Sequence, residues 1–545
     1  MIMSGEPRHE RWIPWLGALL VGGFATILFH RHQFASGFDL FPGPRGDTRV
    51  SAYVCEHWYR VLQGKVALFS PTIFYPVRGT LGYADAMLLF VPPYALLRAV
   101  GLNIFTALGV VVVLFNFLNF VAGFTLLFQV LRYRWLASVA GAMFFAYNNP
   151  KLTQLDNVQL QAIWLLPVST IGIVLLFRNV RSFSGRRTLG LLSLAGLTLN
   201  VQLLTGFYLG WFLIFWSGLF FVVLLCLKPA RELLTFSFRR HWRSILGAAA
   251  ITVVALIPFL LLYLPVQRGV PDWPYQPHLM HIPKLQSYLF MADGNIIWSR
   301  VLDSLQSTLG GPEGWDRGIG IGLVGTLAWL GLSVIALRSR ASHPFLFASI
   351  IAVDLLILIT LQYHGHSLWH KVYALVPGGK AIRDVARFMI FAALPMGIVF
   401  AAAADRAERW VGGRPERYAL LVGVIAFGLL EQFTTGEGQY YSSRAEIHWL
   451  ESLAAKLPAG CTAFYVTGSS AGDPAVDAYH NRQWMHDAMF VSVLRDVPTL
   501  NGRSSKSPPG WQLREVTAPE YESRVRDWVE RHHMTGRICR LQVRG

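Results

Sequence analysis

The residues with the greatest chemical capacity lie in the polar stretch 37–85, which interrupts an otherwise apolar part of the chain and carries four carboxylates. We rank Asp47 first, because it follows a Pro/Gly turn in the sequence PRGDTR and is flanked by Arg45 and Arg49. Neighbouring positive charges favour the ionised carboxylate, which can accept the proton of a hydroxyl group as that oxygen attacks an electrophilic carbon. From spacing alone the favoured interpretation is structural, a helix N-cap or an ion pair within the loop.

The other acids of this stretch are ranked by their surroundings. Asp85, in the sequence GYAD, is second, and Glu56, which is followed by His57, is third. Asp39 comes last because its FDLF context is apolar. Glu56 and His57 belong to an amphipathic segment, so a polar stripe on a helix at the membrane interface explains them equally well.

Arg383 and Arg387 form the second group, in the sequence KAIRDVARF. Residues four apart share one face of a helix, and two guanidinium groups there can bind a phosphate bidentately and stabilise charge that develops on it. Lys380 lies in the same loop and extends the predicted anion site. The alternative is that these side chains reach from the membrane interface to water without binding a ligand.

Polar residues elsewhere give weaker signals. Asp354 lies within an apolar segment, where a carboxylate is costly and by default suggests a function. We interpret it as a neutral structural group bonded to Asn200 or Gln202. No compact spacing of His, Cys, Asp and Glu predicts a metal site, so no metal ligand and no cofactor is assigned, and the use of a divalent metal stays open.

Composition indicates which elements must hold these residues. The chain has 545 residues, 53% hydrophobic and 14% charged, whereas soluble domains have about 25% charged residues. Apolar runs of about 17 to 25 residues recur, which is the length a helix needs to cross a bilayer. We therefore predict an all-α polytopic membrane protein. The net charge of +17 comes from Lys and Arg in short loops, as the positive-inside rule requires, and does not predict nucleic-acid binding.

Eleven spans fit one topology, in which the N-terminus is cytoplasmic and every basic loop lies on the cytoplasmic side. The apolar segment 87–102 is not counted, because a Pro-Pro pair breaks it and a span there would place Arg132 and Arg134 outside. We expect a helix in the interface there. The first outer loop is then 30–86, and the first apolar segment is a retained helix, too long for a signal peptide. The predicted spans are 12–29, 104–131, 135–147, 160–177, 188–204, 207–227, 245–264, 319–337, 345–361, 388–404 and 418–430.

The composition changes near residue 434 to that of a soluble domain. We divide the chain into a membrane module, residues 1–433, and a small extracytoplasmic α/β domain, residues 434–545, in which CTAFYVTG and ICRLQVRG are strand-like. Cys461 and Cys539 each begin one of these strands. In an oxidising compartment they could form a disulfide; the alternative is two buried thiols.

The order of these features resembles that of the GT-C superfamily of integral membrane glycosyltransferases, in its bacterial multi-span branch. The features are a first helix, an outer loop with GD and EHW, then FYP, YAD, a Pro-broken apolar stretch, and two spans separated by an arginine pair and ending in AYNNP. KAIRDVARF and DVPTLNGRSSKSPPG are further matches. The resemblance implies a GT-C-like fold with an acidic base in the first outer loop, the position of Asp47. Similar members often carry a His in the turn after the third span, where this chain has Asp156, kept here as a second acid or a metal ligand.

The resemblance also implies a reaction. We expect an inverting glycosyltransferase of a bacterial plasma (inner) membrane, which moves a sugar from a polyprenyl-phosphate-linked donor to a glycan, lipid or protein acceptor on the outer face. Membrane lipids are its other expected partners, and nucleic acid is not. The expected catalytic residues are Asp47 as general base, then Asp85 and Glu56, and the expected substrate-binding residues are Arg383, Arg387, Lys380, His57 and Asp156. The alternatives are a transporter or flippase of lipid-linked sugars and a non-catalytic assembly partner.

Overall fold

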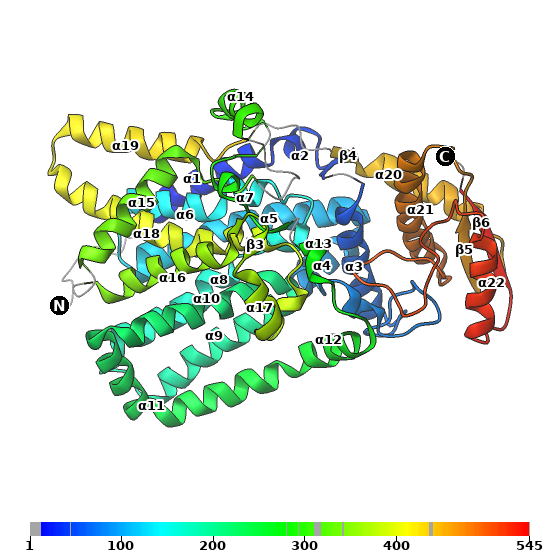
Figure 1. The fold of residues 1–545 in the computed structure, drawn as a ribbon, viewed down its shortest axis with the longest axis horizontal. Helices are drawn as coiled ribbons and strands as arrows, with labels where there is room; N and C mark the ends of the chain where they lie inside the picture. Colours follow the sequence, from blue (N-terminus) through cyan, green and yellow to red (C-terminus); the bar gives the residue numbers. More distant parts are fainter. Residues whose placement is uncertain are drawn as a thin grey trace.

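The protein is elongated, with a helical bundle at one end and a mixed region at the other (Figure 1). A computed structural model describes residues 12–43, 45–278, 281–292, 294–309, 318–339, 343–434 and 440–543. The bundle consists of α1 (Ile13–Phe29), α5 (Ile104–Phe124, continued by a π-helix to Val130), α6 (Trp135–Ala146), α8 (Leu165–Asn179), α9 (Gly185–Thr205), α10 (Phe207–Cys226), α11 (Lys228–Ala255), α12 (Ile257–Gly269), α15 (Gly322–Ser339), α16 (Pro344–Thr360), α18 (Phe388–Val411) and α19 (Pro415–Leu430).

Five helical segments of the described chain are long and apolar enough to cross a membrane, and the bent pair α11 and α12 makes a sixth. The chain is therefore a helical membrane protein, and ten of the eleven predicted spans overlap one helix of the bundle each, whereas the span predicted at 245–264 crosses the bend between α11 and α12. Several of these helices are shorter than a bilayer requires, so the number eleven remains a prediction. The basic stretch between the spans predicted at 207–227 and 245–264 is helical instead of an irregular loop: α11 begins at Lys228 and is interrupted by a kink at His241.

The segment predicted to lie in the interface contains a short helix, α4 (Val91–Ala99), preceded by the 3₁₀-helix Leu88–Phe90. Nine helical residues span about 14 Å, which is less than half of a hydrocarbon core of about 30 Å. The structure thus agrees with the exclusion of this segment from the spans.

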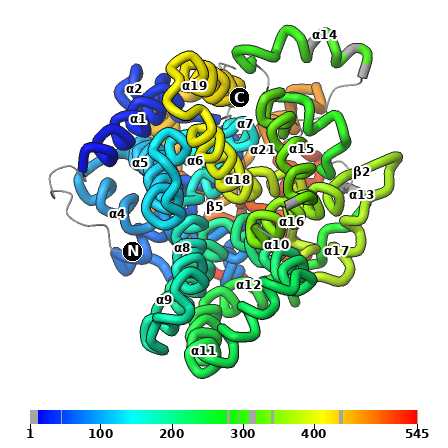
Figure 2. The backbone as a smooth tube through the Cα atoms, turned by 90° about the vertical axis from the view of Figure 1, so that its left-hand side faces the viewer, coloured from blue at the N-terminus to red at the C-terminus, as the bar shows by residue number. Residues whose placement is uncertain are grey.

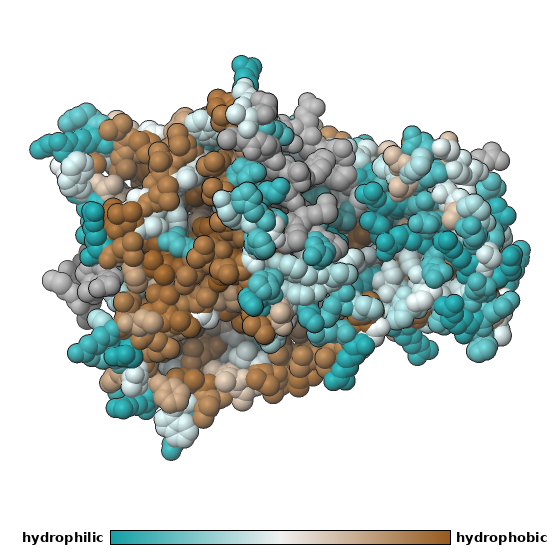
Figure 3. Space-filling model, viewed as in Figure 1, coloured by the Kyte–Doolittle hydropathy of each residue, from teal (hydrophilic) through white to brown (hydrophobic). Residues whose placement is uncertain are grey.

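Hydrophobic side chains form a band over the bundle, between two hydrophilic ends (Figure 3). Within the bundle, helices approach closely where glycines meet: a Cβ at Gly141 of α6 would lie 2.7 Å from the carbonyl oxygen of Gly397 in α18. Asp354 of α16 accepts a hydrogen bond of 2.8 Å from Trp329 Nε1 of α15. The predicted partners of Asp354 were therefore wrong, since Asn200 donates instead to carbonyl groups of α9 and α11.

The turn between α18 and α19 lies at one end of the molecule. At the opposite end, two parts of the chain that are far apart in sequence pack together (Figures 1 and 2). One is the first outer loop, which contains β1 (Leu40–Pro42) and α3 (Asp47–Leu62). The other is the C-terminal region, residues 440–543, with β4 (Tyr440–Ser442), α20 (Ser443–Ala455), β5 (Ala463–Thr467), α21 (Pro474–Arg495), α22 (Tyr521–Arg531) and β6 (Ile538–Gln542). Strand β1 pairs antiparallel with β4, and β5 pairs in parallel with β6.

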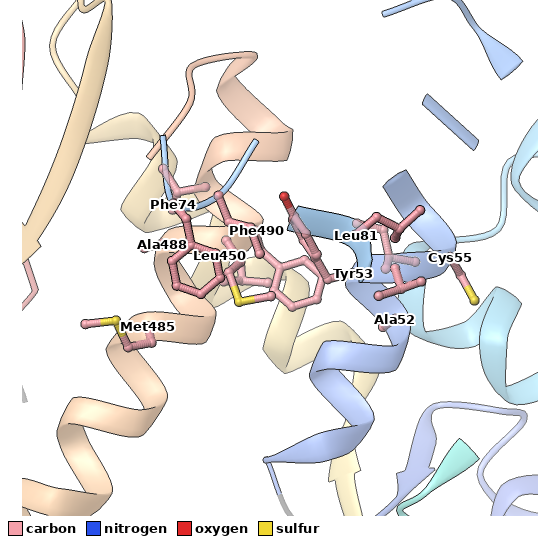
Figure 4. Close-up of a cluster of buried hydrophobic side chains, with 14 of the residues drawn as sticks. Ala52, Tyr53, Cys55, Phe74, Leu81, Leu450, Met485, Ala488 and Phe490 are labelled. Carbon is pink, nitrogen blue, oxygen red and sulfur yellow. The ribbon is translucent and has the colours of Figure 1, made fainter. Parts of the chain in front are cut away.

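The two parts share one hydrophobic core. Tyr53 and Phe74 of the first outer loop pack against Phe490 and Leu450 of the C-terminal region (Figure 4). The backbone joins them as well, because Phe74 N donates to Asn501 O at 3.1 Å. We call this combined unit the outer body. Cys461 and Cys539 form a disulfide in it, with Cα atoms 5.7 Å apart, so the disulfide alternative is confirmed.

Candidate active site

Asp47 is the first residue of α3 and its side chain is exposed. The N-terminus of a helix carries partial positive charge, which favours an anionic side chain there. Gly46 is the N-cap, so Asp47 does not have the N-cap role that its spacing suggested. The carboxylate therefore stands at the start of a helix of the outer body, accessible from solvent.

The neighbouring arginines of Asp47 are bound to other carboxylates. Arg49 is fully buried and pairs with Asp487 at 2.5 Å and Glu446 at 2.9 Å. Arg45 also pairs with Glu446, at 2.8 Å. Their adjacency to Asp47 in sequence therefore does not describe its electrostatic environment. Instead these arginines attach the beginning of α3 to α20 and α21, and so hold Asp47 in place.

Asp47 interacts electrostatically with Arg503, a half-buried residue of the C-terminal region. Burial lowers the pKa of Arg503, the negative charge of Asp47 raises it, and the positive charges of Arg482, Arg514 and Arg383 lower it. Arg503 is thus electrostatically coupled to Asp47 of the first outer loop and also to Arg383 of the loop before α18. It connects the two groups that the sequence singled out separately.

Arg383 and Arg387 do not share a helix face, and that part of the sequence argument was wrong. Arg383 lies in an irregular segment, whereas Arg387 ends a 3₁₀-helix just before α18. Both residues contact Tyr208, at the start of α10. The Arg387 guanidinium lies 5.4 Å from the Tyr208 ring centroid, and the backbone N–H of Arg383 donates to Tyr208 Oη at 2.9 Å. The Arg383 guanidinium lies 5.5 Å from the ring centroid of Trp273.

Asp85 belongs to the arginine side of the site. Its Oδ1 accepts a hydrogen bond of 3.0 Å from the backbone N–H of Phe207, next to Tyr208. Burial raises the pKa of Asp85, and the hydrogen bond from Phe207, the positive charge of Arg387 and a hydrogen bond with Gln159 oppose that rise. Asp85 therefore interacts with Arg387, and its surroundings suit a positioning role for that arginine.

Asp156 lies beside the segment that leads to Asp47. Gly43 has a φ of +98°, and a Cβ there would lie 2.7 Å from Asp156 Cβ and 2.8 Å from Thr48 Cγ2. Only glycine allows this close approach in this backbone conformation. One Asp156 oxygen accepts from Asn157 Nδ2 at 2.9 Å. The turn after the third predicted span thus contacts the beginning of α3.

Glu56 and His57 have structural partners away from Asp47. Glu56 lies nine residues further along α3, about 13 Å along its axis, and is bound by Arg98 Nε at 2.8 Å and by Tyr94 Oη at 2.7 Å. His57 is buried, with Nε2 3.0 Å from Leu68 O, and burial lowers its pKa to about 4. These contacts fasten α3 to α4 and to the loop after α3.

Lys380 pairs with Asp272 at 3.2 Å, in the segment that also carries Trp273. This ion pair orients the segment of Trp273, against which the Arg383 guanidinium lies. Lys380 therefore acts on the predicted anion site through Trp273. For a metal, Asp47 and Asp156 are the carboxylates near the start of α3. Within the described ranges no three His, Cys, Asp or Glu side chains gather as a metal site would require, and we derive no chemical step through a metal ion.

Comparison with known proteins identifies the architecture. The structure of the Archaeoglobus fulgidus oligosaccharyltransferase in its apo form aligns with 96% of this chain and 69% of that chain, with a TM-score of 0.51 and 12% identity. The chain has a GT-C-like fold. ArnT from Cupriavidus metallidurans, bound to undecaprenyl phosphate, aligns with 91% of this chain and 90% of that chain, with a TM-score of 0.40 and 12% identity. Its apo state covers 89% and 85%, at a TM-score of 0.37 and 12% identity. Neither a protein-family model nor a curated protein matches the sequence.

The GT-C-like fold brings together residues that the sequence argument did not connect. Arg482, Arg503 and Arg514 come from the C-terminal region and interact electrostatically near Asp47. The signal was the polar, basic sequence LNGRSSKSPPG, which contains Arg503 and which we noted as part of the resemblance. Its link to the first outer loop depends on contacts across more than four hundred residues, which spacing in one sequence does not reveal.

Proposed function

We propose that this protein is a membrane glycosyltransferase, which moves a sugar from a polyprenyl-phosphate-linked donor to an acceptor on the extracytoplasmic side of a bacterial inner membrane. The observation that carries the proposal is the electrostatic interaction of Arg503 with both Asp47 and Arg383, in a chain with a GT-C-like fold. A carboxylate and a phosphate-binding arginine are the two groups that transfer from a sugar phosphate requires.

The donor phosphate binds Arg383 and Arg387 at the outer end of the bundle. Tyr208 holds both, through the backbone of Arg383 and the guanidinium of Arg387. Guanidinium groups bind phosphate oxygens through paired, charge-assisted hydrogen bonds. Arg387 Nε also lies 3.1 Å from Asp384 Oδ2, and Asp85 interacts with Arg387 electrostatically. The polyprenyl chain lies in the membrane beside the hydrophobic band of the bundle.

Asp47 acts as the general base. It takes the proton of an acceptor hydroxyl while that oxygen forms a bond with the anomeric carbon. The bond from the anomeric carbon to the phosphate oxygen breaks, and its electron pair leaves with the polyprenyl phosphate. Arg383 and Arg387 stabilise the negative charge that develops there. Attack opposite to the leaving phosphate inverts the anomeric configuration.

The rival functions fit the positions of the charges less well. A transporter of lipid-linked sugars would distribute ionisable side chains along the pathway between its helices. Here Asp47, Arg383 and Arg503 gather at the outer end of the bundle, with Asp47 exposed. A non-catalytic assembly partner would not need an exposed carboxylate facing half-buried arginines.

The test compares Asp47→Asn with wild type, both purified into lipid nanodiscs. Polyprenyl monophosphate is the binding probe, and polyprenyl-phosphate hexoses labelled in the sugar are the donors, with cell-envelope membranes as the acceptor source. We expect Asp47→Asn to bind the probe like wild type and to lose transfer by about a hundredfold or more. Arg383→Gln and Arg387→Gln are expected to weaken probe binding by about tenfold.

Glu56→Gln is the matched control, since it removes a carboxylate from the same helix. It breaks the pair with Arg98 and lowers stability by about 2 kcal/mol, while the folded fraction keeps its transfer rate. Transfer by Asp47→Asn at the wild-type rate would exclude Asp47 as the base. Failure of wild type to bind polyprenyl monophosphate would exclude the donor class.

A further inference from the structure

The arginines around Asp47 exceed what one donor phosphate requires. Arg503 interacts electrostatically with Asp47 and with three further arginines, Arg383, Arg482 and Arg514. Within the described part of the chain, none of the four has a carboxylate oxygen within ion-pair distance. By contrast, the neighbouring Arg49 binds two carboxylates. Arg383 and Arg503 are half-buried, where a charge is normally paired or solvated, and Arg482 and Arg514 are exposed, so this group of arginines is open to an anionic ligand.

The fold holds these arginines at one place. Asn481, next to Arg482, exchanges two hydrogen bonds with Thr517, three residues after Arg514, at 3.0 and 3.1 Å. This pair fixes the start of α21 beside the segment of Arg514. Gln483 Nε2 donates to Arg45 O at 2.6 Å, which sets the same turn of α21 against the beginning of α3. The side chains on either side of Arg482 thus bind the segment of Arg514 and the residue two positions before Asp47.

Arg503 is fixed to the donor side as well. Gly502 packs directly on the ring of Phe74, with space for no Cβ. Three residues after Arg503, Lys506 donates from Nζ to Pro271 O at 3.3 Å. Pro271 is two residues before Trp273, on which the Arg383 guanidinium lies. The segment of Arg503 thus joins the first outer loop to the support of Arg383.

His486 lies among these arginines without adding to their charge. It is fully buried on α21, and neither ring nitrogen has a hydrogen-bond partner in the described structure. Burial and the positive charges of Arg49, Arg503 and Arg482 lower its pKa well below the usual range. A neutral imidazole one turn from Arg482 adds no charge, so the positive charge in this region comes from the arginines.

We propose that the acceptor is an anionic molecule, and that Arg482, Arg503 and Arg514 of the C-terminal region bind its phosphate or carboxylate group beside the base Asp47. This inference rests on the proposed function. The general base must contact the acceptor hydroxyl, so Arg503, which interacts with Asp47, and the two arginines of the outer body that interact with Arg503 lie on the acceptor side. The donor phosphate has its own pair, Arg383 and Arg387. An anion that approaches an ionised Asp47 is repelled, and the three arginines offset that repulsion.

The experiment measures binding of matched soluble probes to the full chain in nanodiscs: glucose, glucose 6-phosphate and glucuronate. We expect the two anions to bind about tenfold or more tightly than glucose. Arg503→Gln, Arg482→Gln and Arg514→Gln should each reduce that preference, more so at low salt. The control is Arg526→Gln, an exposed arginine of α22 in the same region, which should leave the preference unchanged. Arg482 and Arg514 are exposed, so these two variants test the site without disturbing a core.

The same variants are tested with polyprenyl monophosphate and polyprenyl diphosphate. We expect Arg503→Gln to bind the monophosphate like wild type. If the variant instead loses monophosphate binding, or loses a wild-type preference for diphosphate, the arginines hold the donor and the inference is wrong. Equal binding of glucose and its anionic analogues by wild type also overturns it. The proposed function fails separately, through absence of monophosphate binding by wild type or normal transfer by Asp47→Asn.

Discussion

Arg49 Nη2 lies 2.5 Å from Asp487 Oδ1, although the two residues are separated by 438 positions in the sequence. The pair is buried and has Glu446 as a third member. It lies two residues from Asp47. The position of the proposed base therefore depends on a carboxylate of α21.

Replacement of Arg49 tests this dependence. Arg49→Met leaves Asp487 buried without its cation, while Glu446 keeps only Arg45, and loss of one partner of a buried pair typically costs about 3 to 5 kcal/mol. We expect the thermal midpoint, followed by tryptophan fluorescence, to fall by about 10 °C. Arg444→Met is the control, because Arg444 is exposed and 3.7 Å from Asp39, a pair worth about 1 kcal/mol or less. Equal midpoints for the two variants would show that the buried pair does not stabilise the outer body.

Gly43→Ala tests the approach of Asp156 to the start of α3. The new Cβ would meet Asp156 and Thr48 at less than 3 Å, so we expect the transfer rate to fall by about tenfold or more. Gly37→Ala is the matched control. Gly37 also has a positive φ, of +61°, but a Cβ there meets nothing within 4 Å, so that variant carries backbone strain of about 1 kcal/mol and normal activity. Equal rates for both would contradict a role for this contact.

The lowered pKa of His57 predicts that the folded protein loses stability in acid. Its folded pKa of about 4 lies below the usual 6.5, because the buried ring is held neutral. The stabilisation is complete above about pH 6.5 and is lost as the pH falls towards about 4, by about 3 kcal/mol. We expect His57→Gln to lose less stability than wild type between about pH 7 and about pH 5. His448→Gln, at an exposed site, should follow wild type. A wild-type response from His57→Gln would assign the acid sensitivity to other groups.

The disulfide gives a test of compartment. Of the four cysteines, Cys461 and Cys539 are bonded and Cys55 and Cys226 are free. Denatured protein treated with maleimide should therefore gain two labels without reductant and four with it. Cys461→Ser with Cys539→Ser should lower stability by about 2 to 5 kcal/mol. Four labels without reductant would argue against an extracytoplasmic outer body.

The lengths and charges of the apolar runs predicted the helices of the bundle well, because a membrane span depends on local composition. The segment 87–102 was excluded from the spans by the positions of Arg132 and Arg134, and its helix is indeed short. Local composition failed where a helix continues past the apolar run, as in α11. Local composition also failed to predict the partner of Asp354, because the packing of α15 on α16 brings Trp329 to this carboxylate.

The site was predictable only in part. Asp47, Asp85, Asp156, Arg383 and Arg387 were named from their local sequences, and the structure brings the surroundings of these residues to the outer end of the bundle. Which arginine faces Asp47 was not predictable, because Arg45 and Arg49 are adjacent in sequence but pair with carboxylates of the C-terminal region. Arg503 replaces them as a result of the fold of the outer body.

The pairing of β1 with β4 has a consequence for biosynthesis. Leu40–Pro42 emerges from the ribosome long before Tyr440–Ser442 has been translated. During that interval the first outer loop has no partner for its strand, for Arg49 or for the rings of Tyr53 and Phe74. Asp47 can therefore be set in place only after the C-terminal region has been made, so chains interrupted before that region would insert into the membrane without assembling the site.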